Sequence, residues 1–287
     1  MNRDLETVDC PVCGPSRMRV WLDDGKPTRY QRCLDCGTVY ASPRASWRSR
    51  YAWLDDKFSF KEGVFNLMDP RLPALQLEAA FIQKHIPHGR MLDVGCSIGS
   101  LFEFFPPSSW ERYGVELSPS AASYAADKYQ CEVKVGTLRE AAYDGGYFDF
   151  ISLIDTLYYL DDPAKEFQEM HRVLKPGGYV AVEVAGQAYM LKRNYGFIPW
   201  LIDRRKSRAS TDSSYIYWFN PIGLQRLLKN CGFQVAAWYV VPSPRKVNLI
   251  ARMVTQSHFI LASGLAKISY RSLTWAPKYL CVAQKNH

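Results

Sequence analysis

The order of three segments between Arg90 and Val184 constrains the fold of this chain more than any other feature of its sequence. The segments read Met91-Leu-Asp-Val-Gly-Cys-Ser-Ile-Gly99, Tyr113-Gly-Val-Glu-Leu-Ser-Pro119 and Leu174-Lys-Pro-Gly-Gly-Tyr-Val-Ala-Val-Glu-Val184. Each is an apolar, β-rich run that meets a turn or the start of a helix. Glu116 lies about 20 residues beyond the first turn, where a carboxylate can reach a ribose hydroxyl. The three segments therefore predict an α/β sheet that binds a nucleoside.

Strand and helix signals alternate along the rest of the chain. Apolar, β-rich runs predict seven strands, at residues 90–95, 113–117, 131–135, 148–154, 179–184, 234–241 and 278–283. Helix starts are marked by Asp69-Pro70, Ser118-Pro119, Asp162-Pro163 and Asn220-Pro221. A further helix is expected at 100–105, and Pro176-Gly177-Gly178 should stop the helix that precedes the fifth strand. This alternation is typical of a Rossmann-like, mostly parallel seven-stranded sheet with helices on both faces.

The eight cysteines form two populations. Four stand singly in apolar contexts, as small core residues do, and the other four make two CxxC units, Cys10 with Cys13 and Cys33 with Cys36. Two CxxC turns can close a tetrahedral shell of four thiolates, which leaves no open position for a catalytic water. In a reducing cytosol metal binding is favoured over disulfides. We predict a small N-terminal ribbon held by a structural zinc ion, with a redox-active CxxC as the alternative.

The turn after the first strand distinguishes two classes of nucleoside site. A dinucleotide site uses the spacing Gly-x-Gly-x-x-Gly, and Ser100 stands where the third glycine belongs, so NAD binding is disfavoured. The chain instead resembles class I S-adenosylmethionine-dependent methyltransferases, whose pattern is an acidic residue, any residue, then Gly-x-Gly-x-Gly. Asp93, Gly95 and Gly99 match that pattern, while Ser97 replaces the middle glycine. The resemblance implies an enzyme whose cofactor is S-adenosylmethionine.

The resemblance also implies which residues contact the cofactor. Glu116 would accept hydrogen bonds from both ribose hydroxyls, and Asp93 would order the amino end. The family often has an acidic residue where Thr137 stands, so the adenine end departs from the usual pattern. The other implied contacts are Gly95, Cys96, Ser97 and Gly99 around the methionine portion, Leu117, Thr137 and Leu138 around the adenine, and Asp155 after the fourth strand.

The stretch from Asp155 to Pro163 resembles the part of the family that lines the methyl-transfer site. Tyr158-Tyr159 replaces a Glu-His pair that is common there. Because an oxygen nucleophile benefits from a general base, we predict Asp155, Tyr159 and Glu183 as catalytic residues. Asp212 and Tyr215 are further candidates from the following segment. The alternative is that the tyrosines pack and that Asp155 caps a turn.

The predicted domains are a zinc ribbon at 1–45, a connector with N-terminal helices at 46–89, and a methyltransferase domain at 90–287. An insertion at 186–219, rich in aromatic and basic residues, would close over the site. A ribbon followed by this domain resembles a bacterial group that modifies glycans, lipid-linked saccharides and natural products. We therefore expect a small hydroxylated acceptor. The net charge of +8 leaves RNA methylation open as an alternative. A second alternative is a non-catalytic adaptor that binds the cofactor.

The location and assembly of the protein are constrained less strongly. No stretch approaches the run of about 18 apolar residues that spans a membrane, and the first residues have no apolar targeting segment. We therefore expect a cytoplasmic protein. Apolar residues at helical spacing in 247–269 predict an amphipathic helix that lies on anionic lipid or packs against the sheet. The sequence does not predict the oligomeric state.

Overall fold

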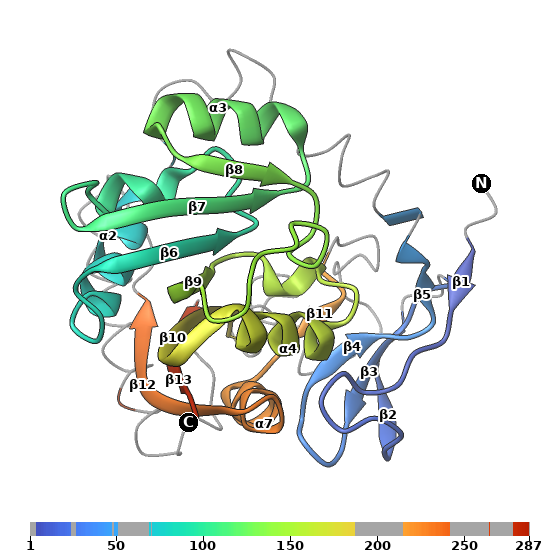
Figure 1. Cartoon of the computed structure of the whole chain (residues 1–287). Coiled ribbons are helices and arrows are strands. Elements are labelled where there is room, and N and C mark those ends of the chain that lie inside the picture. The colour runs from blue at the N-terminus through green and yellow to red at the C-terminus, as the bar shows by residue number, and fades with distance from the viewer. Residues whose placement is uncertain are drawn as a thin grey trace, which may run out of the picture.

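A seven-stranded sheet forms the centre of the molecule, with the strand order β12-β13-β10-β9-β6-β7-β8 (Figure 1). The computed structural model describes residues 4–23, 27–47, 49–50, 69, 71–186, 215–241, 264 and 278–286. The strands of this sheet are β6 (Gly89–Val94), β7 (Trp110–Glu116), β8 (Glu132–Val135), β9 (Phe148–Leu153), β10 (Leu174–Ala185), β12 (Phe233–Val241) and β13 (Lys278–Lys285). The strands β8, β7, β6, β9 and β10 pair in parallel, and β13 runs antiparallel to both its neighbours. The predicted mostly parallel α/β sheet is confirmed.

Alternating side chains along the strands build a hydrophobic core on each face of the sheet. Met91 and Phe150 belong to a cluster that includes residues of α2 (Leu72–Ile82) and of the 3-10 helix η1 (Ser100–Phe104). Their neighbours Leu92 and Ile151 belong to a second cluster, with residues of α4 (Pro163–Val173) and α7 (Pro221–Asn230). Because successive strand residues point to opposite sides, helices cover both faces, as predicted. The helix α3 (Pro119–Tyr129) lies beside β7 and β8 (Figure 1).

Three of the four predicted helix starts have the expected cap. The side chains of Ser118, Asp162 and Asn220 each accept a hydrogen bond from the backbone N–H three residues later, and proline follows each of them. The fourth prediction, Asp69-Pro70, is wrong. Helix α2 begins only at Leu72 with no side-chain cap, because the Asp69 carboxylate accepts from the Arg71 backbone N–H inside the preceding turn.

The end of α4 also differs from the prediction. The helix ends at Val173, and Leu174 already has extended backbone. The residues Pro176-Gly177-Gly178 lie inside β10, where the pairing with β9 shifts register between Leu174 and Tyr179. They therefore do not stop the helix but make an irregularity in the strand.

The N-terminal region contains a second sheet, whose order is β11-β4-β3-β2. Its strands are β2 (Met18–Leu22), β3 (Tyr30–Cys33), β4 (Val39–Ala41) and β11 (Tyr217–Trp218), while β1 (Leu5–Glu6) pairs separately with β5 (Arg44–Ala45). Strand β11 comes from the end of the predicted insertion and pairs antiparallel with β4. The ring of its Trp218 stacks on Tyr30 with the centroids 4.9 Å apart. Two segments about 180 residues apart in sequence thus share one sheet and one aromatic core.

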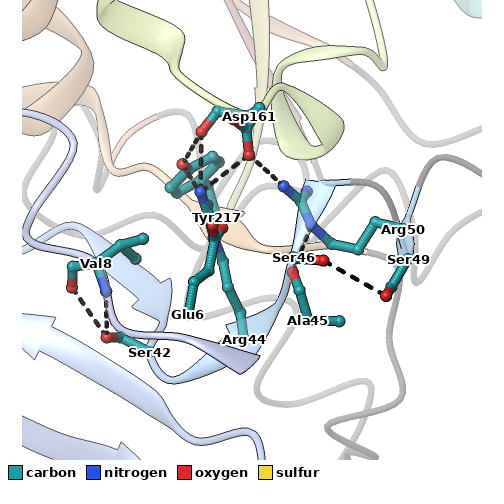
Figure 2. A network of polar contacts seen from close by, with 10 residues as sticks. All are labelled: Glu6, Val8, Ser42, Arg44, Ala45, Ser46, Ser49, Arg50, Asp161 and Tyr217. Carbon is teal, nitrogen blue, oxygen red and sulfur yellow. Dashed lines mark hydrogen bonds and ion pairs between the residues drawn. The ribbon is translucent and has the colours of Figure 1, made fainter. Parts of the chain in front are cut away.

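A buried arginine of β5 links strand β11 of this second sheet to the segment between η2 and α4. Figure 2 shows Arg44, 4% exposed, with its guanidinium between Asp161 and the hydroxyl of Tyr217. Arg44 Nε donates to Glu6 Oε1 at 2.7 Å, and Arg50 also pairs with Asp161. Since Asp161 lies between the 3-10 helix η2 (Leu157–Tyr159) and α4, the network fixes the second sheet against the carboxyl edge of the central sheet.

Parts of two predictions lie outside the described residues. They are most of the insertion, at 187–214, and the amphipathic segment at 247–269 apart from residue 264. Across the ranges that are described, no helix has the length and apolar character needed to cross a lipid bilayer.

Candidate functional site

The loop after β6 is held by the carboxylate of Glu116 at the end of β7. Glu116 Oε2 accepts from the Ser97 backbone N–H at 2.8 Å, and Oε1 accepts from the Ser118 N–H at 2.9 Å. Burial raises the pKa of Glu116, although these backbone hydrogen bonds favour its charged form. The Leu117 backbone N–H also interacts with this carboxylate, and since a carboxylate has about four lone-pair sites, part of its acceptor capacity remains for a ligand. The structure thus brings together two predicted contacts, Ser97 and Glu116.

The backbone of this loop requires small residues. A Cβ on Gly95, whose φ is +75°, would lie 2.5 Å from Thr156 Oγ1. Ser97 has φ +51°, a left-handed conformation that costs a residue with a Cβ roughly 1 kcal/mol. The family pattern has glycine at this position, and glycine adopts a left-handed conformation without this cost. Cys96 is buried, and Gly99 begins η1.

Asp93 lies at the end of β6, beneath the loop. Its carboxylate is 5% exposed and accepts a hydrogen bond from Ser152 Oγ at 2.7 Å. Burial raises its pKa to about 7, because this hydrogen bond only partly compensates for lost solvation. Asp93 can therefore change protonation near neutral pH when a cation approaches.

The predicted adenine contacts are arranged around a small cap after β8. The Thr137 N–H and hydroxyl both donate to Glu140 Oε2, at 2.7 and 2.8 Å, and Thr137 Oγ1 accepts from the Glu140 N–H. This is a capping box of the form Thr-x-x-Glu. Leu138 is buried, and Leu117 is half-buried at the end of β7. Sequence reasoning missed Glu140, which the spacing Thr-Leu-Arg-Glu indicates.

The predicted catalytic carboxylates lie together at the carboxyl ends of β9 and β10. Lys278 Nζ lies 2.5 Å from Asp155 Oδ1 and 2.9 Å from Glu183 Oε1. Arg71 Nη1 lies 3.4 Å from the other oxygen of Asp155 and also pairs with Asp69. The structure therefore brings Asp155 and Glu183 together through a lysine that the sequence did not single out.

Sequence reasoning missed Lys278, Arg71 and Asp69 as members of this cluster, and it also missed the buried Glu78, which interacts with Lys278 and Glu183. Lys278 and Arg71 carry no local signal, because their partners lie far away in sequence. Glu78 does carry one, since it lies on the same face of α2 as the buried Leu75, Ala79 and Ile82. An acidic residue on an apolar helix face indicates a buried polar partner.

Three tyrosines form the adjoining wall. The ring of Tyr215 lies 4.8 Å from that of Tyr158 and 5.4 Å from that of Tyr159, centroid to centroid. The Tyr30 hydroxyl donates to the Tyr215 carbonyl at 2.7 Å, and the Ile216 N–H donates to the Tyr158 carbonyl at 3.0 Å. The second sheet therefore helps to position the aromatic wall beside Asp155. The further candidate Asp212 lies outside the described residues.

The four ribbon cysteines converge as predicted. The sulfur atoms of Cys10, Cys13, Cys33 and Cys36 all lie within 4.8 Å of one another. Cys10 Sγ and Cys36 Sγ are 3.6 Å apart, and a hydrogen bond from the Cys10 thiol helps to lower the pKa of Cys36 to about 5. Thiolates on a tetrahedral zinc ion lie about 3.8 Å apart at the usual Zn–S distance. The separations fit a metal of this kind.

Helix α7 braces this cysteine cluster. Asn220, which caps the helix, donates from Nδ2 to the Cys36 carbonyl at 3.0 Å. Arg226 Nη1 lies 3.5 Å from Cys13 Sγ and donates to the Asp35 carbonyl at 3.1 Å. One helix of the central fold thus contacts both CxxC turns.

Comparison with known proteins places the chain in a family. A family model described as a methyltransferase domain matches residues 65–237. A sterol 4-C-methyltransferase of Caenorhabditis elegans is 23% identical over 53% of this chain and 49% of its own length. A ubiquinone biosynthesis O-methyltransferase of Ralstonia nicotianae is 28% identical over 49% of this chain and 60% of its own length. The chain thus spans about half the length of these curated relatives.

A solved structure gives the same indication for the fold. An S-adenosylmethionine-dependent methyltransferase from Mesorhizobium loti is 17% identical, with a TM-score of 0.52. The alignment covers 76% of this chain and 98% of that chain. At this identity the likeness concerns the fold alone.

Proposed function

Since this chain belongs to the methyltransferase-domain family, we propose that it transfers the methyl group of S-adenosylmethionine to a small hydroxylated acceptor. The acceptor class is a saccharide, a lipid-linked saccharide or a natural product. The observation that carries the proposal is the position of Glu116, whose carboxylate holds both the loop after β6 and the start of α3. A ribose diol placed there would donate to the acceptor capacity that remains on this carboxylate.

The residues around the loop fit the chemistry of the cofactor. Asp93 would meet the ammonium group, while the narrow backbone at Gly95 and Gly99 would admit the methionine portion. Cys96 and Ser97 would form the loop around it. Leu117, Thr137 and Leu138 would surround the adenine. Glu140 places a carboxylate next to Thr137. When bound, the cofactor supplies an electrophilic methyl group on a sulfonium ion.

The carboxylates support an oxygen acceptor. Removing the proton from a hydroxyl as it attacks calls for a nearby base, and Asp155 is the more accessible of the two carboxylates that contact Lys278, with 22% of its side chain exposed against 1% for Glu183. Tyr159 and Tyr215 would pack against the acceptor. The relative from Ralstonia nicotianae is itself an O-methyltransferase.

We also propose a structural zinc ion for the four ribbon thiols. The donor set is four sulfurs, and none of the eight cysteines forms a disulfide. A closed four-thiolate shell stabilises a fold but offers no site for substrate. The cytoplasm, where thiols stay reduced, is the location that we propose.

Calorimetric titration tests the cofactor part of the proposal. S-adenosylmethionine and S-adenosylhomocysteine should each bind with one site per chain, whereas NAD should give no heat. Absence of heat with both sulfur nucleosides would refute the proposal. A panel of hydroxylated acceptors, with labelled cofactor, then tests the acceptor class, and RNA retained at low salt would redirect it to nucleic acid.

A further inference from the structure

More carboxyl groups than cations meet beside the proposed methyl-transfer site. The group contains Asp69, Glu78, Asp155 and Glu183 on the acidic side and Arg71 and Lys278 on the basic side. Four carboxylates against two cations would leave an excess charge of −2 if every group were ionised. Such an excess is costly in a buried place, where charges are poorly solvated. The cluster therefore has reason to retain protons.

The cations are shared unequally among the carboxyl groups. Asp155 receives both, Lys278 at one oxygen and Arg71 at the other. Within the described part of the chain, Lys278 is the one cation paired with Glu183, and no cation lies within ion-pair distance of Glu78. Glu78 and Asp155 both interact electrostatically with Glu183. Like charges that lie close together in a buried place disfavour each other, so a proton on one of the carboxyl groups relieves the repulsion.

Glu78, Glu183 and Asp155 form a row of three carboxyl groups, which we call the carboxyl chain. Glu78 and Glu183, at its inner end, are buried away from solvent. Glu78 and Glu183 are each 1% exposed. Among the described residues, Glu78 Oε2 finds no hydrogen-bond partner, and the side chain of Tyr158 is equally buried. Tyr158 lies within electrostatic reach of Glu183 and Asp155. A buried polar atom without a partner indicates a site that changes its protons or its ligands.

The pKa values of the three carboxyl groups differ in the way that their cation contacts predict. Burial raises the pKa of Glu183 well above its usual value, and it raises that of Glu78 to about 7. Burial would also raise the pKa of Asp155, but attraction to Lys278 and Arg71 outweighs it, and this pKa is lowered. The groups that face the chain are Arg71 and Asp69 before α2, Asp155 after β9, Tyr158 of η2, Lys278 of β13 and Tyr239 of β12.

We propose that Glu78 and Glu183 hold one proton between them, release it when a sulfonium ion binds beside Asp155, and take up the acceptor proton as that charge disappears. The inference rests on the proposed function. The location follows from contacts: Thr156, next to Asp155, packs against Gly95, and Asp69 hydrogen-bonds Ser100 at the end of the loop. A positive charge near this group favours ionised carboxylates.

These residues take up the proton that the acceptor loses during methyl transfer. The acceptor O–H bond breaks as the O–CH3 bond forms, and the S–CH3 electron pair returns to sulfur. Asp155, the accessible end of the chain, receives the hydroxyl proton. Glu183 and Glu78 then store it, because the positive charge that kept them ionised is gone. Product release to solvent restores the starting state.

Calorimetry in buffers of different ionisation enthalpy counts the protons exchanged on binding, with S-adenosylmethionine and S-adenosylhomocysteine as probes. Both ligands carry the amino group and the ribose, so contributions from Asp93 and Glu116 cancel in the difference between them. Near pH 7, S-adenosylmethionine should release about half a proton to one proton more than its demethylated product. In the Glu78→Gln and Glu183→Gln variants the difference should fall toward zero.

Glu166→Gln is the matched control, since Glu166 is also a buried carboxyl with a raised pKa but lies on α4 and pairs with Arg139. It should keep the full difference. Equal proton counts for the two ligands in the wild-type protein would overturn the inference, even if neither variant folds. A difference that persists in both glutamine variants would overturn it as well. If neither ligand gives heat, it is the proposed function that fails.

Discussion

The carboxylate of Glu116 gives the sharpest test of the cofactor site, through the substitution Glu116→Gln. Glutamine is nearly isosteric but replaces one carboxylate oxygen with an NH2 group. The two oxygens now accept from the backbone N–H groups of Ser97 and Ser118, at 2.8 and 2.9 Å. In the variant one of these N–H donors therefore faces another donor, and one ribose hydroxyl loses a charged acceptor.

The size of the effect follows from these contacts. A hydrogen bond to a charged group contributes about 1.5 to 3 kcal/mol, so the loss of one should weaken binding of S-adenosylhomocysteine about 10- to 150-fold. The backbone N–H that loses its acceptor should also lower the free energy of unfolding by about 1 to 3 kcal/mol. Binding and stability should thus fall together, because one side chain serves both.

Titration calorimetry measures the affinity, and chemical unfolding without ligand measures the stability. Glu111→Gln is the control, since Glu111 lies near the opposite end of β7 and pairs with Arg90 at the surface. Its side chain is 60% exposed, and exposed ion pairs contribute about 0 to 1 kcal/mol. Wild-type affinity for S-adenosylhomocysteine in a folded Glu116→Gln protein would refute the placement of the ribose.

Three further predictions concern pH, the second sheet and the metal. Burial raises the pKa of Asp93 to about 7 in the folded protein. Ionisation of Asp93 should therefore lower the free energy of unfolding of the wild type by about 4 kcal/mol between pH 4 and 8, relative to the Asp93→Asn variant. Parallel curves of stability against pH for the two proteins would exclude this. Arg44→Met should lower the free energy of unfolding by about 2 kcal/mol, since the buried hydroxyl of Tyr217 and the carboxylate of Asp161 lose the guanidinium that they contact. The exposed Arg19→Met on β2 should change it by less than about 0.5 kcal/mol. The purified protein should contain one zinc per chain. A chelator should lower the unfolding midpoint and shift the fluorescence of Trp218, whose ring stacks on Tyr30 of the second sheet. A zinc-free protein with an unchanged midpoint would contradict the metal assignment.

Local signals predicted much of the central fold. Each strand of the sheet overlaps its predicted range, because buried parallel strands are short apolar runs bounded by turns. The caps at Ser118, Asp162 and Asn220 were equally readable, since a cap involves residues only three apart. The two errors, at Asp69 and at Pro176, arose where a nearby side chain or strand pairing overrode the local preference of a proline.

Contacts between segments that are distant in the sequence could not be predicted from local patterns. The pairing of β11 with β4 joins residues about 180 positions apart, and nothing in Tyr217-Trp218 alone distinguishes a ribbon strand from a loop. The burial of Glu78 beside Glu183 and the approach of Lys278 to Asp155 likewise depend on how α2 and β13 dock. These contacts decide the charge of the site.

The sequence by itself determined the strand and helix order, the likeness to a methyltransferase, and the two CxxC units, because each is encoded in residues a few positions apart. Only the tertiary structure decided which side chains share a buried environment. Burial and charge neighbours set whether a carboxyl group holds a proton, and both depend on distances through space that spacing along the chain does not record.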